Sequence, residues 1–261
     1  MPVDDVDTRP ATTRPLTRRE RLRRQTVDEI VERALELVDT GGAHGLSIAS
    51  VSKAMGMTPP ALYHYFASRE ALLDALVLAG YTDLGTAVEA AADAASDRPA
   101  ADQVAAIAHA WRRWALEHPR RYAMLFTGSR REAVDPLEHV GPISRSMLAL
   151  VRAIQDLVPE DGARSAGGVG AAGARPDGDA RAADTELGSD PGLDSELSRW
   201  GRSLGASART APGALRLALS TWYRVHGLVS LELVGGFDTM GLDGGSLLAA
   251  EVRSLVQEAA R

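Results

Sequence analysis

The chain has 261 residues, with 29 Lys and Arg against 35 Asp and Glu, a formal net charge of −6 and no cysteine. This length accommodates one large or two modest domains. The lack of cysteine excludes disulfides, thiolate metal sites and a cysteine nucleophile. The first residues lack the apolar core of a signal peptide, and no segment approaches the roughly 20 apolar residues of a membrane span. We therefore expect a cytoplasmic protein that does not bind a membrane.

Positive charge is concentrated near the N-terminus. Residues 14–69 contain nine basic and six acidic side chains, a balance of +3, so the remainder carries −9. The arginines that cluster against the single acid Glu20 are Arg14, Arg18, Arg19, Arg21, Arg23 and Arg24. A basic end on an acidic body favours phosphate at that end. We interpret residues 1–16 as a flexible basic arm; alone, such an arm could equally be solvated and without a specific partner.

Residues 17–67 are predicted to form three helices. A helical stripe ends at Gly41 and Gly42 and consists of Val27, Ile30, Val31, Ala34, Leu35 and Val38. Ser47 is expected to cap a second, short helix, and Gly56 to supply a turn. Thr58 and Pro59 then begin a third helix, whose Leu62 and Phe66 face the core. The segment from Ser47 to Arg69 contains no acidic residue, which is typical of a helix-turn-helix that reads DNA.

The rest of the chain, residues 68–261, also has helical periodicity. Ser68 is expected to cap a long helix that runs toward Ser96. Further helices are predicted near residues 104–117, 120–126, 136–158 and 193–204. Residues 162–192 are rich in Gly, Ala, Asp and Arg and are interpreted as a disordered linker. Two strong helices follow, at 213–234 and from a cap at Ser246 to the C-terminus.

The last two helices carry more apolar surface than one neighbour can cover. We therefore expect a homodimer, although the same residues could simply complete the core of one chain. The predicted dimerisation residues are Leu217, Leu228, Leu231, Leu248, Val252 and Leu255.

Most large side chains of the second half are candidates for an effector pocket. They are Trp111, Trp114, Tyr122, Phe126, Met147, Trp222 and His226. Each of them could instead belong to an ordinary helical core. His226 lies within an apolar stripe and needs a hydrogen-bond partner, which could be an effector or Tyr122.

Signals for catalysis are weak. The histidines and acids lack metal-ligand spacing, and the glycine-rich segment 41–45 is not followed by the Lys and Ser or Thr of a phosphate-binding loop. We expect no metal, no cofactor, no catalytic residue and no enzymatic activity.

The block from Thr26 to Val77 resembles the DNA-binding domain of TetR-family transcriptional regulators, most clearly in GMTPPALYHYFASREALL, residues 56–73. The resemblance implies an all-α fold with a three-helix DNA-binding head and a helical-bundle domain for effector binding and dimerisation. The DNA-contacting positions that it implies are Ser47, Ser50, Thr58, Pro59, Ala61, Tyr63, His64, Tyr65 and Arg69. One departure is Pro59-Pro60, which removes two potential amide donors where the family often has Lys or Gly.

The resemblance implies a DNA-binding transcriptional regulator, more often a repressor than an activator. Its expected partners are a pseudo-palindromic double-stranded operator, a second copy of itself and a small, largely apolar effector that releases it. The alternative is a helical-bundle carrier or enzyme of small molecules in which the helix-turn-helix is incidental.

Overall fold

The computed structural model describes residues 16–126, 136–157 and 191–259. All regular elements in these ranges are α-helices or 3-10 turns, and none is a strand. The all-α prediction is therefore confirmed. The predicted arm (1–16) and linker (162–192) lie almost wholly outside the described residues. Contacts divide the chain into two compact units, Met1–Leu76 and Val77–Arg261. The domain boundary predicted at residue 68 stays a prediction.

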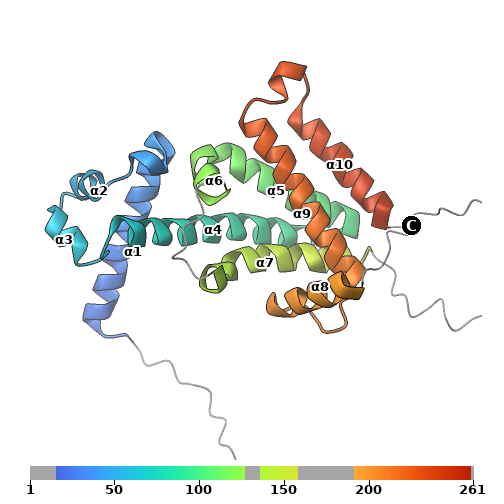
Figure 1. The fold of residues 1–261 in the computed structure, drawn as a ribbon, viewed down its shortest axis with the longest axis horizontal. Helices are drawn as coiled ribbons and strands as arrows, with labels where there is room; N and C mark the ends of the chain where they lie inside the picture. Colours follow the sequence, from blue (N-terminus) through green and yellow to red (C-terminus); the bar gives the residue numbers. More distant parts are fainter. Residues whose placement is uncertain (1–15, 127–135, 158–190, 260–261) are drawn as a thin grey trace, which may run out of the picture. The chain divides into compact units, whose positions relative to one another are not determined.

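The first unit contains the three helices that were predicted for the head and one short 3-10 turn between the first two (Figure 1). They are α1 (Arg18–Gly41), the 3-10 turn η1 (Ala43–Gly45), α2 (Ile48–Ala54) and α3 (Pro59–Tyr63). Ser47 caps α2 as expected, and Gly56, with φ of 65°, makes the left-handed turn between α2 and α3. A capping box of Thr17 and Glu20 begins α1, a T-x-x-E pattern that the sequence prediction did not use.

Helix α4 (Arg69–Ala94) is capped by Ser68, whose hydroxyl accepts from the Ala71 amide at 3.1 Å. In length and composition α4 is the one helix of the described chain that could cross a membrane. The expectation that no segment approaches the roughly 20 apolar residues of a membrane span was thus wrong. Leu84 and Val88 of α4 are buried in the core of the second unit, and a core helix passes the same test.

The core of the second unit lies among α5 (Ala100–Glu117), α7 (Pro136–Gln155), α9 (Pro212–Leu233) and α10 (Gly244–Ala259). Helix α9 contacts α5, α7, α8 (Pro191–Ser203) and α10, and is therefore covered on several sides, as its nearly all-round apolar sequence requires (Figure 1). The remaining elements are α6 (Pro119–Phe126) and the 3-10 turn η2 (Asp238–Met240).

Charged side chains of α9 bind neighbouring helices. Arg216 pairs with Asp194 of α8, and Arg224 pairs with Glu251 and Glu258 of α10, at 3.1 Å each. At the end of α9, Glu232 accepts two hydrogen bonds from Arg112 of α5, at 2.6 and 2.7 Å. The Arg112–Glu232 pair is bidentate, so it fixes the orientation of α5 against α9 as well as their distance. The pairs of Arg216 and Arg224 are additional contacts of α9 with α8 and α10.

Two predicted helix starts were wrong by a few residues. The cap of α10 is Asp243, whose carboxylate accepts from the Ser246 amide at 2.7 Å, and Ser246 itself is inside the helix. That hydrogen bond is the main cause that lowers the pKa of Asp243. Helix α8 begins at Pro191, so the last two residues of the predicted linker are helical, because proline suits the first turn of a helix.

A hydrogen-bonded pair of ring side chains, Tyr122 and His226, lies against the core of the second unit. The Tyr122 hydroxyl is 2.7 Å from His226 Nδ1, so the second of the two partners foreseen for His226 is the one observed. Burial lowers the pKa of His226 and raises that of Tyr122, which keeps both rings neutral near pH 7.

We predict that His226 makes the protein less stable in acid. Because its pKa is lower in the folded chain, the unfolded chain binds more protons below about pH 6.5, and the free energy of unfolding falls as the pH decreases through that value. His226→Gln should flatten this dependence in urea unfolding at pH 7.5, 6.5 and 5.5, whatever its absolute stability.

The matched control is His109→Gln, which removes an exposed imidazole on α5 and should leave the pH dependence as in the wild type. Equal acid sensitivity of the wild type and His226→Gln would contradict the prediction.

Candidate nucleic-acid interface and effector pocket

The third helix of the head is anchored by two apolar side chains. Leu62 is fully buried and Phe66 is 7% exposed. Between them Tyr63 is 52% exposed and His64 is exposed, while Tyr65 is partly covered. Two anchors four residues apart therefore turn the intervening side chains outward. The sequence prediction of a sequestered Leu62 and Phe66 is confirmed. Of the two side chains expected to face outward, His64 is exposed and Tyr65 is only partly exposed.

Helix α3 itself is only five residues long and ends at Tyr63, with His64 as its C-cap. The predicted positions His64 and Tyr65 thus follow the helix rather than lie on it, although the amides of Tyr65 and Phe66 still bond to the Leu62 carbonyl. Thr58 occupies the N-cap position but its side chain makes no capping bond. Thr58 and Pro59 are exposed, and Ala61 is partly exposed.

The serines before and in α2 bind each other. The Ser47 hydroxyl accepts from the Ser50 amide and the Ser50 hydroxyl accepts from the Ser47 amide, both at 3.0 Å. The amides of the first helical residues, Ile48 and Ala49, have no acceptor among the described residues. For a phosphate at this end of α2, these two amides are more available than the serine hydroxyls.

Arg69 holds the start of α4 to the connection before α2. Its Nε donates to the Leu46 carbonyl at 2.7 Å, and its Nη2 donates to the Ala43 carbonyl at 3.0 Å. The family resemblance implies that Arg69 contacts DNA. Two of its three nitrogens are instead used within the head, which leaves Nη1 for an outside partner.

Arg23 of α1 contacts the end of α3, a contact that the sequence prediction missed. Its Nη2 donates to the His64 carbonyl at 3.0 Å, and its guanidinium carbon lies 5.3 Å from the centre of the Tyr65 ring. A cation is stabilised at the carbonyl end of a helical turn by the helix dipole, and over an aromatic face by the cation–π interaction. Arg23 was recognised only as one of a basic cluster, because its partner is 41 residues away in sequence.

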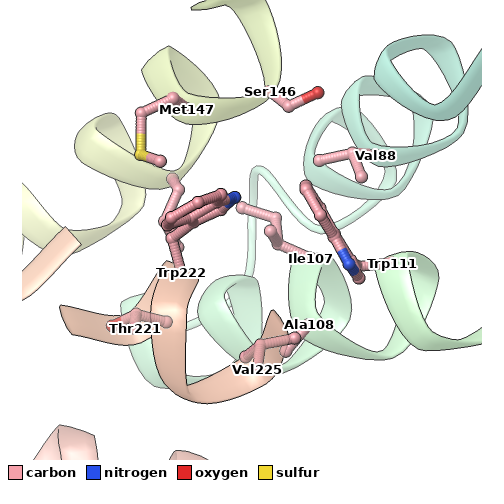
Figure 2. Close-up of a pocket in the computed structure, with 10 residues that line it drawn as sticks. Val88, Ile107, Ala108, Trp111, Ser146, Met147, Thr221, Trp222 and Val225 are labelled. Atoms are coloured by element: carbon pink, nitrogen blue, oxygen red, sulfur yellow. The ribbon is translucent and has the colours of Figure 1, made fainter. Parts of the chain in front are cut away.

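The second unit contains a small apolar pocket with about 420 Å³ of empty space, counting its opening to solvent. Figure 2 shows Trp111 and Trp222 on two sides of it, with Ile107 between them and Met147 and Ser146 opposite. The full lining is Val88, Ile107, Ala108, Trp111, Ser146, Met147, Leu150, Thr221, Trp222 and Val225.

Of the seven side chains predicted for an effector pocket, the structure places Trp111, Met147 and Trp222 in this lining. Tyr122, Phe126 and His226 form an adjoining cluster of rings: Phe126 lies 4.7 Å from both Tyr122 and His226, and 5.7 Å from Trp111, between ring centres. Trp114 lies elsewhere, because its indole donates to Asp83 at 3.0 Å and its ring packs on His118.

The predicted dimerisation residues separate into two groups. Leu248, Val252 and Leu255 are buried in their own chain by the packing of α10 on α5 and α9, so in this structure they are core residues, a correction to the sequence prediction. Leu217 and Leu228 are partly buried against the core, and only Leu231, at 54%, is well exposed.

Within the described part of the chain, no group of three or more His, Asp or Glu side chains is arranged to hold a metal ion.

Two models of known protein families match the chain, one in its N-terminal part and one in its C-terminal part. Residues 30–76 match the model described as bacterial regulatory proteins, tetR family. Residues 104–255, more than half of the chain, match the model described as tetracyclin repressor-like, C-terminal domain.

Individual relatives agree with these models. The HTH-type transcriptional regulator Mb1846 of Mycobacterium bovis is 38% identical over 104 residues, which are 40% of this chain and 44% of that protein. YobS, an HTH-type transcriptional regulator of Bacillus subtilis, is 33% identical over 93 residues, 36% of this chain and 47% of YobS. The match thus spans less than half the length of these curated relatives.

A solved structure is similar over nearly the whole chain. SCO4313, described as a regulatory protein, superposes with a TM-score of 0.66 at 32% identity, over 92% of this chain and 98% of that one. Together with the two family models, this similarity shows that the chain belongs to the TetR family of bacterial transcriptional regulators.

Proposed function

We propose that the chain is a repressor that binds a pseudo-palindromic operator as a homodimer and is released by a small, largely apolar effector. The observation that carries the proposal is the exposed surface of Tyr63 and His64 within a segment free of acidic residues. Hydroxyl and imidazole groups can donate to phosphates and base edges, and no carboxylate of that segment repels the DNA backbone. Such a regulator acts on the chromosome, so we place it in the cytosol.

The rival interpretation as a carrier or enzyme is set aside, because both matching family models describe regulators. The pocket of the second unit supports a regulated repressor instead. Its apolar lining suits an apolar effector. If the effector binds one of two conformations of the repressor more tightly, the loss of operator affinity is limited by the difference between its affinities for the two conformations.

Exposed apolar side chains on α9 and at its C-cap support a dimer. Tyr223 and Leu231 are exposed and follow a helical spacing with Gly227 between them, and the C-cap Val234 is exposed as well. A side chain at Gly227 would meet nothing within 4 Å, so a second helix can approach this face closely. Two heads of such a dimer would read half-sites roughly 34–36 Å apart on DNA.

Operator binding by a dimer-deficient variant tests the proposal. We expect genomic fragments captured by the wild type to bind in anisotropy assays, with affinity that falls steeply as salt rises. Leu231→Glu places a charge in the proposed interface, so it should sediment as a monomer and bind the fragment roughly 100-fold more weakly, since the second head no longer adds avidity.

The control is Leu116→Glu, which alters an exposed leucine of α5 and should leave both dimer and affinity unchanged. Failure of the wild type to select any fragment would contradict DNA reading, and a tightly binding monomeric Leu231→Glu would contradict the dimer.

A second prediction concerns Arg23 as the side chain that positions the end of α3. Arg23→Gln should weaken operator binding about tenfold, because it removes both the bond to His64 and the contact with Tyr65. Arg24→Gln removes the same charge from an exposed neighbour on α1 and should cost only about two- to threefold.

Arg23→Lys separates positioning from charge. Lysine keeps the charge but cannot form the planar fork. We therefore expect Arg23→Lys to restore only part of the operator affinity that Arg23→Gln loses in the same anisotropy assay. Full recovery by Lys, or equal losses for the two glutamine variants, would mean that Arg23 contributes only its charge.

A further inference from the structure

The apolar pocket contains hydrogen-bond donors that have no acceptor. The indole nitrogens of Trp111 and Trp222 are both buried and unpartnered among the described residues. Thr221, another lining residue, is satisfied, because its hydroxyl donates to the Leu217 carbonyl of its own helix at 2.8 Å. A buried donor without a partner is costly, and a bound molecule that supplies an acceptor recovers that cost.

Trp222 is the better placed of the two donors. Figure 2 shows its nitrogen at the end of the ring that faces the middle of the pocket. The Trp111 nitrogen lies at the end of its own ring that is turned away from the middle of the pocket. Trp222 therefore directs its donor toward the space that a ligand would fill, whereas Trp111 does not.

The direction of the Trp222 donor is fixed by ring packing. The indole stacks on His226 with ring centres 5.4 Å apart and planes only 12° from parallel. His226 is in turn held by the Tyr122 hydroxyl. Rotation of the indole would break this stack, so the N–H is directed before any ligand binds.

The charge of the surroundings restricts what the ligand can be. No charged side chain is among the residues that line the pocket within the described chain. The nearest titratable rings, His226 and Tyr122, are kept neutral by burial. An ionic group would enter without a counter-charge, which is unfavourable in an apolar site.

We propose that the pocket binds an uncharged, largely apolar molecule whose carbonyl or ether oxygen accepts a hydrogen bond from Trp222 Nε1. The proposal rests on the regulatory function above for its biological role, and it specifies the chemical class of the effector. Hydrocarbons of the same shape fit the lining but leave the donor unpaired, and anions or cations lack a counter-charge.

Four one-ring probes of similar size test this choice on the full-length ¹⁵N-labelled protein without DNA. Acetophenone offers a neutral acceptor, ethylbenzene offers none, and benzoate and phenyltrimethylammonium are charged. Chemical-shift titration of the four indole N–H signals, assigned with Trp→Phe variants, gives affinity and location together. Acetophenone should bind roughly tenfold more tightly than each of the other three and move the Trp222 signal downfield.

Trp222→Phe keeps an aromatic ring but removes the donor. It should abolish the preference for acetophenone over ethylbenzene, whereas Trp200→Phe, outside the pocket lining, should preserve it. The proposal is overturned by a preference that survives Trp222→Phe, by tighter binding of either ion, or by acetophenone that leaves the Trp222 signal unmoved up to its solubility.

The two proposals fail separately. If acetophenone binds as expected but does not lower operator affinity, release by an effector is contradicted while the ligand class stands.

Discussion

The burial of Leu62 and Phe66 is the constraint on which the DNA-binding head depends. Helix α3 has five residues, too few to be stable by its own hydrogen bonds, so its position is set by these two apolar anchors. Because both point inward, the side chains of Tyr63 and His64 have no room in the core and face solvent. The surface proposed to read DNA is thus a direct consequence of packing, and loss of either anchor would remove the helix together with its exposed face.

Polar contacts refine what the anchors establish. Arg23 and Arg69 both donate to backbone carbonyls, at His64 on one side and at Ala43 and Leu46 on the other. His64 and Leu46 are the C-cap residues of short elements, where carbonyls lack a partner within the helix, and the Ala43 carbonyl gains a second donor beside the Leu46 amide. The arginines of the head therefore combine two tasks, since part of the positive charge that favours DNA also holds the backbone that presents Tyr63 and His64.

Local rules in the sequence predicted much of this organisation. Capping, turn and periodicity rules act within a few residues and predicted four positions that the structure has in place. They are the caps Ser47 and Ser68, the turn residue Gly56 and the buried Leu62. The partners of Arg23 and Arg69 depend on how distant segments meet, which no local pattern encodes. Periodicity likewise identified the apolar face of Leu248, Val252 and Leu255, but not whether their own chain or a second copy covers it. The indole donor of Trp222 became visible only when the neighbouring side chains were in place.

Hydrogen exchange of the full-length chain, with and without an operator duplex recovered from genomic fragments, tests most directly whether this face reads DNA. We predict slower amide exchange in the segment from Ser47 to Phe66 when the duplex is bound, with the strongest effect around α3. If saturating DNA leaves exchange in this segment unchanged and slows it only in α5 to α10, the face formed by Tyr63 and His64 does not read DNA.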